Sequence, residues 1–160
     1  QPECLVCHNN HRIVHPEDSL IGLDEGAVCA TCHDSSTKGS PTIAEIRKRF
    51  DGLSAAMAGA EAVLTRAERA GMLVDDGRSA LHEASEHRIN AHVMLHGFSA
   101  APIAELTDQG MAAARKAETT GRSAMQELAY RRTGLAIATL VIFGFLVTLG
   151  IKIRSLPPAD

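Results

Sequence analysis

The first 40 residues contain the same five-residue pattern twice and carry too few apolar side chains to build a core of their own. The two C-x-x-C-H motifs comprise Cys4, Cys7 and His8, then Cys29, Cys32 and His33. All four cysteines of the chain lie in these motifs. A segment this short and polar does not fold around aliphatic side chains alone. We therefore expect a small irregular head over residues 1–40, held together by disulfides, a metal or a covalent cofactor.

C-x-x-C-H is the attachment signature of c-type haem. Two thiols three residues apart on a tight turn reach the two vinyl groups on one edge of the porphyrin, and the next residue supplies an imidazole as an axial ligand of the iron. This interpretation predicts two haem c groups. Each has two covalent cysteines and one proximal histidine: Cys4 and Cys7 with His8, and Cys29 and Cys32 with His33.

Three other uses of the cysteines compete with haem. The spacing C-x2-C-x21-C-x2-C is close to that of a zinc ribbon, but a ribbon needs no histidine after both pairs and brings strands. The segment shows no alternating apolar pattern. Two structural disulfides form the second alternative. A dithiol redox motif is the third, and it would require a strand followed by a helix. The repeated histidine makes haem the favoured interpretation.

A six-coordinate c-type haem needs a second axial ligand, histidine or methionine. The first methionine is Met57, in an expected helix, so the 8 histidines are the better candidates. His11 lies too close to His8 to reach the opposite face of the same haem, and we expect it to serve a neighbouring one. His15 is an alternative, because Pro16 favours an extended backbone before it.

Four further histidines fall on the second expected helix: His82, His87, His92 and His96. For any one of them, a polar surface position is the ordinary interpretation. We favour His96 as a distal ligand, folding back onto the second haem, because it ends its helix beside a turn near the start of the first helix. The predicted distal ligands are therefore His11, His96 and His15.

Residues 41–130 are predicted to form a helical bundle or stalk. Pro41 suits a first helical position after Ser40 as N-cap, and Gly71 is a natural end. The apolar positions recur at steps of three and four: Ile43, Ile46, Phe50, Leu53, Met57, Ala60, Leu64 and Ala67. A second helix is expected from about Asp76 to His96, and a third after Ser99. The predicted fold is mainly α, an antiparallel helical hairpin followed by a long third helix.

The third helix is predicted to continue into a single C-terminal transmembrane helix. Residues 133–151 carry no charge, and 19 helical residues span about 28 Å, close to the thickness of the hydrocarbon core of a bilayer. Basic residues flank both ends, so they leave the orientation open. Since the span holds no His, Asp or Glu, we interpret 131–154 as an anchor and 155–160 as a cytoplasmic tail.

Charge and histidine content narrow the function further. A net charge of −3 implies no polyanion-binding surface, so no nucleic-acid partner is expected. A catalytic haem needs an open axial site, and the surplus of histidines argues against an enzyme. The chain begins at Gln1, and we expect that an upstream portion with further haems can precede it.

These residues resemble a known family. "CLVCHNNHRIVHPEDSLIGLDEGAVCATCHD", followed by "AGMLV", "LHGFS" and "YRRTGLAI...KIRSL", is similar to the end of membrane-anchored multihaem c-type cytochromes of the small tetrahaem, class III cytochrome c-like group. The resemblance implies electron transfer and further haem motifs upstream, and "LHGF" adds weight to His96.

The expected function is electron transfer by covalent haems at the outer face of the inner membrane. Haem is attached to such motifs in the periplasm, which would place the head there and the C-terminus in the cytoplasm. The expected partners are redox proteins, with the chain a subunit of a larger membrane complex that links a quinol-linked respiratory or photosynthetic complex to a periplasmic carrier. Two alternatives remain: an assembly or bridging subunit of a redox complex, and a zinc-ribbon membrane adaptor without redox role.

Overall fold

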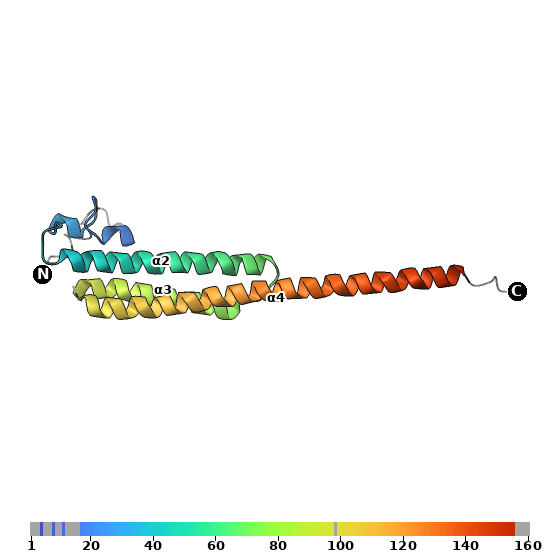
Figure 1. Ribbon diagram of the computed structural model, residues 1–160. Coiled ribbons are helices and arrows are strands. Elements are labelled where there is room, and N and C mark those ends of the chain that lie inside the picture. Colours follow the sequence, from blue (N-terminus) through green and yellow to red (C-terminus); the bar gives the residue numbers. More distant parts are fainter. Residues whose placement is uncertain (1–3, 5–7, 9–10, 12–16, 98, 156–160) are drawn as a thin grey trace.

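The computed structural model describes residues 4, 8, 11, 17–97 and 99–155, and Figure 1 shows their arrangement. Two short 3-10 turns, η1 (Asp18–Leu20) and η2 (Cys29–Thr31), precede three helices. These helices are α2 (Ser40–Arg69), α3 (Asp75–Met94) and α4 (Ala100–Arg154), with the 3-10 turn η3 (Leu95–Gly97) between the last two. The described residues contain no strand. The predicted fold class, a mainly α chain with a helical hairpin and a long third helix, is confirmed.

The helix boundaries follow the sequence signals closely. Gly71 adopts φ +83° directly after α2, a left-handed conformation that ends helices and favours glycine. The start of α2 differs from the prediction, because Ser40 is the first helical residue and Gly39 takes the capping position. The Ser40 hydroxyl instead donates to the backbone oxygen of Asp34 in the preceding turn. This bond directs the hydroxyl toward the preceding turn, and α2 has no side-chain cap hydrogen bond at its N-cap.

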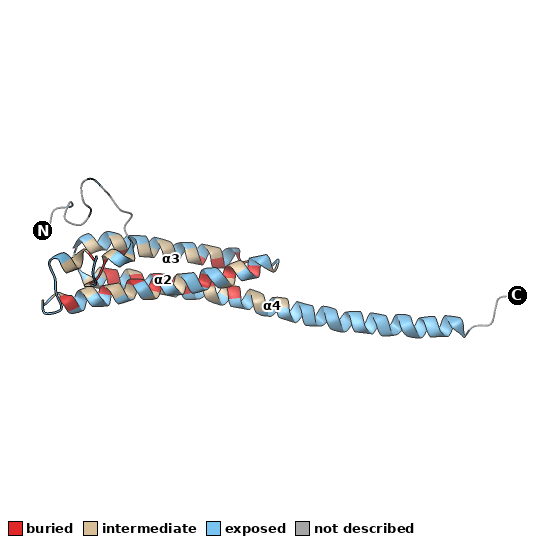
Figure 2. Ribbon diagram, turned by 90° about the horizontal axis from the view of Figure 1, so that it is seen from above, coloured by how far each residue is buried: buried red, intermediate tan, exposed pale blue. Residues whose placement is uncertain are grey.

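The core of the bundle consists of three successive clusters along the helices. The cluster nearest the head joins Ile21 to α2, α3 and α4 through Ile46, Phe50, Ala91 and Ile103. The middle and distal clusters are built mostly from alanine and leucine, including Leu53, Ala84, Ala114, Ala60, Leu64 and Ala117. Six positions of the predicted apolar stripe are buried, namely Ile46, Phe50, Leu53, Ala60, Leu64 and Ala67. The interpretation of this stripe as bundle core is therefore correct, and Figure 2 shows the buried residues along the inside of the three helices.

Small residues allow the helices to approach closely at the distal end. A Cβ atom added to Gly77 of α3 would lie 2.5 Å from Cδ2 of Leu64 in α2. Heavy atoms do not approach so closely, so alanine at this position would force the Leu64 side chain to shift within the packed core. The close packing explains how a chain with so few aromatic residues still buries a continuous core.

The last third of α4 extends beyond the bundle and is exposed along its whole length (Figures 1 and 2). At 55 residues, α4 is about 80 Å long. Its C-terminal part is long and apolar enough to cross a membrane, and none of that apolar window is buried in the structure. The core helix of a soluble domain with the same composition would instead be covered by its neighbours. The head and the C-terminal end of α4 lie at opposite ends of the molecule (Figure 1).

Candidate haem-binding site

The second C-x-x-C-H motif forms one helical turn. The backbone N–H groups of Cys32 and His33 both donate to the carbonyl oxygen of Cys29, with N–O distances of 3.3 Å and 2.9 Å. Residues spaced three and four apart share one side of such a turn. Cys29 and Cys32 are free thiols, half-buried and exposed respectively, and His33 is exposed. The turn therefore presents both thiols and the imidazole together, as covalent attachment of a haem requires.

A hydrogen-bond network holds the His33 ring. Its Nδ1 atom lies 3.3 Å from Oγ1 of Thr37, and that hydroxyl donates to the carbonyl oxygen of Asp34 at 2.9 Å. Because the hydroxyl gives its hydrogen to a carbonyl, its lone pairs accept from Nδ1–H, which leaves Nε2 unprotonated for a metal. Gly39 adjoins the same ring, since a Cβ atom there would lie 3.3 Å from Cε1 of His33.

Thr37 and Gly39 are site residues that the sequence interpretation missed. Thr37 stands four residues after an expected axial ligand, at the turn that leads into α2. This spacing is a usable signal, because axial histidines commonly donate their second N–H to a nearby oxygen.

A negative charge sits beside the same ring. Oδ1 of Asp34 accepts from the hydroxyl of Ser36 at 2.6 Å and from its backbone N–H at 2.8 Å. The bond from the Ser36 hydroxyl is the main cause that lowers the pKa of the Asp34 carboxyl. Asp34 therefore stays ionised at neutral pH next to His33, where a negative charge favours the more positive, oxidised state of an iron.

The first motif is described only in part. Cys4 is an exposed free thiol and His8 is half-buried, whereas Cys7 lies outside the described residues. The His8 ring lies beside that of His96, with ring centroids 6.2 Å apart and an angle of 21° between the ring planes. His96 is in η3, directly after α3, and its Nδ1 atom is 3.0 Å from the carbonyl oxygen of Val93. The structure thus brings a predicted distal ligand to a predicted proximal one.

The other predicted distal ligands are placed less fully. His11 is exposed in the structure, and His15 lies outside the described residues. Their roles remain predictions. On α3, His82 and His87 approach Glu86 and Glu83 at 3.6 Å and 3.9 Å. The exposed position of His82 fits the surface role expected for it, whereas the His87 side chain is only 24% exposed and its Nδ1 atom is buried without a hydrogen-bond partner in the described structure.

His92 has a structural role that the sequence did not reveal. Its Nε2 atom lies 2.7 Å from Oδ1 of Asp18 in η1, and its ring packs on Phe50 with centroids 4.4 Å apart. Oδ2 of Asp18 also accepts from the Ser54 hydroxyl at 2.7 Å. The side chains of His92 and Asp18 are only 18% and 15% exposed, so the pair is largely shielded from water. These bonds fasten the segment between the two motifs to α2 and α3.

A second contact joins the backbone of the head to α2. The Arg47 guanidinium of α2 donates to the carbonyl oxygen of Ile21 at 2.8 Å, and its Nε binds Asp51 on the same helix. Ile21 itself is buried in the cluster around Phe50. The second motif, at residues 29–33, therefore follows a segment that is fixed to the end of the bundle.

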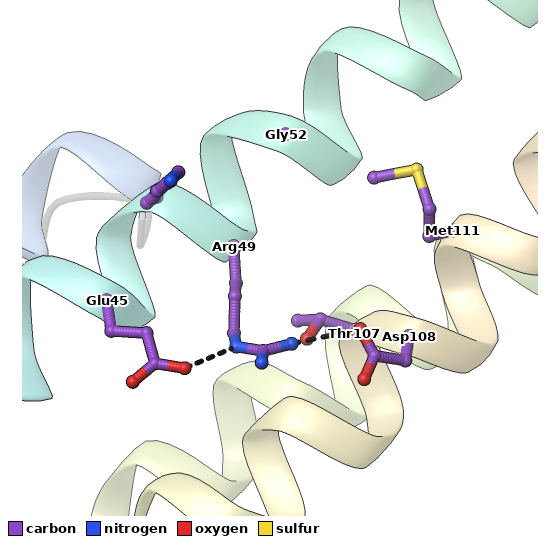
Figure 3. A pocket seen from close by; sticks show the side chains of 7 residues that line it. Glu45, Arg49, Gly52, Thr107, Asp108 and Met111 are labelled. Atoms are coloured by element: carbon purple, nitrogen blue, oxygen red, sulfur yellow. Dashed lines mark hydrogen bonds and ion pairs between the residues drawn. The ribbon is translucent and has the colours of Figure 1, made fainter.

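A separate pocket of about 260 Å³ lies between α2 and α4 (Figure 3). Arg49 bridges its two sides, with ion pairs to Glu45 at 3.1 Å and to Asp108 at 2.9 Å. Hydrogen bonding to Glu45 is the main cause that raises the pKa of Arg49. The lining residues are Glu45, Lys48, Arg49, Gly52, Thr107, Asp108 and Met111. Since they include no cysteine or histidine, this pocket has no thiol or imidazole for haem.

The structure also bears on the zinc alternative. Within residues 4, 8, 11, 17–97 and 99–155, no group of three or more His, Cys, Asp or Glu side chains converges on a point that could hold a metal ion. The same part of the chain lacks the strands that a zinc ribbon requires.

Comparison with known proteins adds one finding. Residues 1–38 match the protein family described as "Doubled CXXCH motif". No curated protein and no solved structure matches the chain. The doubled CXXCH motif is that of a multihaem c-type cytochrome-like protein and indicates covalently bound haem. It also indicates an electron carrier rather than a catalytic enzyme.

Proposed function

We propose that the protein transfers electrons through two covalently bound haem c groups, carried in a head that α4 holds above a membrane. The observation that carries this proposal is the doubled CXXCH motif, together with the helical turn that places Cys29, Cys32 and His33 on one side. When bound, a c-type haem supplies an iron that alternates between Fe(III) and Fe(II), which is one-electron chemistry.

The residues of the chain would divide the work between attachment and ligation. Cys29 and Cys32 would form thioethers with one haem, and Cys4 and Cys7 with the other. The Nε2 atoms of His33 and His8 would be the proximal ligands. Around His33, the Thr37 hydroxyl orients the ring and increases the basicity of Nε2, and the ionised Asp34 lies nearby.

The membrane arrangement follows from where haem attachment takes place. Because the motifs receive haem outside the cytoplasm, the head would lie in the periplasm, with the apolar part of α4 across the inner membrane and residues 155–160 in the cytoplasm. The partners would be redox proteins: a quinol-linked complex in the membrane and a periplasmic carrier. The small tetrahaem group remains our proposal for the family to which the whole chain is related.

The proposal is tested by the chromophore itself. The purified full-length protein, denatured in alkaline pyridine, should give a c-type haemochrome at two haems per chain, and acid–acetone should extract none of it. A potentiometric titration should then show reversible one-electron steps. A colourless protein with stoichiometric zinc would overturn the proposal and favour the adaptor alternative.

Replacing Thr37 with valine should raise the reduction potential of the haem bound at the second motif. The valine removes the oxygen that accepts from Nδ1 of His33, so the imidazole becomes a weaker donor to Fe(III). Loss of one hydrogen bond is worth about 1 kcal/mol, or on the order of 40 mV for one electron. Redox titration of the full-length protein measures the change. Thr37→Ser keeps the oxygen and should restore the original potential, whereas equal potentials in all three proteins would contradict the role of Thr37.

A further inference from the structure

We infer that His96 is the distal axial ligand of the haem at the first motif, opposite His8. This inference rests on the proposed function, since it requires haem at Cys4 and Cys7. It differs from the expectation drawn from the sequence, which linked His96 to the second haem. It makes the end of α3 part of a haem site and joins the head to the bundle through an iron.

The first support is the distance between the two rings. Two imidazoles on opposite faces of one iron have centroids about 6 Å apart, because each metal–nitrogen bond is about 2.0 Å and each ring centre lies about 1.1 Å behind its nitrogen. The centroids of His8 and His96 are 6.2 Å apart. Aromatic rings in direct contact have centroids about 4.5–7 Å apart, so the distance also fits an ordinary stacked pair inclined by 21°. The separation is also that of two imidazoles with an iron between them, and the experiment below distinguishes the two arrangements.

The second support is the tautomer of His96. Its Nδ1 atom lies 3.0 Å from the carbonyl oxygen of Val93, and a carbonyl can only accept a hydrogen bond. Nδ1 must therefore carry the hydrogen, and the lone pair is on Nε2. An imidazole with its Nδ1–H bound to a backbone carbonyl is a typical axial or metal-bound histidine, since this bond fixes both the tautomer and the direction of the ring.

The third support is that the histidines of α3 are either bonded to another side chain or too far from His8. His92 uses Nε2 for Asp18 at 2.7 Å and is packed on Phe50, so ligation would break a largely buried pair. His87 precedes His96 by nine residues, which is about 13 Å along a helix. His96 is in the final turn, where the chain reverses between α3 and α4 and meets the first motif.

The surface beside His96 also suits a porphyrin. Ile89 and Val93 of α3 precede His96 by seven and three residues, on the same side of the helix, and are 60% and 55% exposed. Two exposed aliphatic side chains are ordinary on a protein surface, so they add to the argument only an apolar surface next to His96. A porphyrin plane next to His96 would provide apolar cover for side chains in this region.

The test uses the full-length haem-loaded protein with His96→Ala, and His82→Ala on the exposed side of α3 as a matched control. The wild type and the control should be entirely low-spin by electron paramagnetic resonance and absorption. His96→Ala should convert one haem of two to high spin without loss of covalent haem, and added imidazole should restore the low-spin signal. A merely structural role for His96 would not produce this rescue.

A variant without the cysteines of the second motif shows which of the two haems changes spin state. In a Cys29→Ala/Cys32→Ala protein, the only haem is the one at the first motif, and His96→Ala should make it wholly high-spin. His96→Met provides a variant that keeps a ligand: it should stay low-spin with a higher potential and the absorption of a sulfur-ligated ferric haem. If His96→Ala leaves both irons low-spin, the His8–His96 pair is an ordinary ring contact and the inference is wrong. A wild type without covalent haem would instead refute the proposed function.

Discussion

Replacing Cys29 and Cys32 together with alanine should remove one of two covalent haems and leave the other in place. The two thiols are the only groups of the second motif that can form thioethers, and they lie on one helical turn with His33. Without them the second haem has no covalent attachment, so the ratio of pyridine haemochrome to protein should fall by half. Mass spectrometry of the intact chain should show the loss of one haem mass.

The matched control lies between the two cysteines. Ala30→Ser changes a side chain of the same turn without touching a thiol, and it should leave two haems per chain. If the double cysteine variant still carries as much covalent haem as the wild type, the second motif is not an attachment site. The cysteines would then have to serve one of the other uses, a zinc site, a disulfide or a dithiol.

Ending the chain after Ala129 should release a water-soluble protein that is still coloured. Residues 133–151 carry no charge, and the side chains of this region are exposed in the structure, so nothing within the described chain covers them. A helix of this kind in a bilayer is effectively irreversible as an anchor. After membrane fractionation, the full-length protein should be in the pellet and the fragment 1–129 in the supernatant, with its haem content unchanged.

Ending the chain after Arg154 is the corresponding control, since it removes only the tail and should leave the protein in the membrane fraction. The fragment 1–129 keeps all of the buried residues of α2 and α3 and the packed part of α4. We therefore expect it to fold. Retention of this fragment in the membrane would show that a partner subunit, rather than the end of α4, holds the protein there.

Periodicity predicted the bundle because each helix buries one face. Phe50, Leu53 and Leu64 follow the three-and-four spacing of a helix seam, and all three are completely buried. Gly71 marked the end of α2 for an equally local reason, since its positive φ is one that other residues avoid. Local patterns of this kind can be read in a sequence without knowing which segments meet.

The contacts between distant segments could not be predicted in the same way. His92 and His96 are four residues apart in the sequence, His92 in the last turn of α3 and His96 in η3 directly after it. The packing of η1 against α3 gives them different roles. Asp18 of η1 binds His92, whereas the His96 ring lies beside that of His8. The prediction of Ser40 as the N-cap of α2 was wrong for a similar reason. Its hydroxyl donates instead to the carbonyl oxygen of Asp34, six residues earlier.

The unbroken course of α4 sets how far the haems would stand from a bilayer. The helix runs without interruption from Ala100, beside the head, to Arg154, and 33 residues of it precede the apolar stretch. If the apolar stretch spans a bilayer, that length would hold the head about 50 Å above the membrane surface, and an average helix tilt of about 20° would move it sideways by about 17 Å. The rate of electron tunnelling falls steeply over such a distance. On the proposed function, a quinol-linked donor would need an exit cofactor at about the same height above the membrane as the head, so the length of α4 would limit which redox proteins can exchange electrons with it.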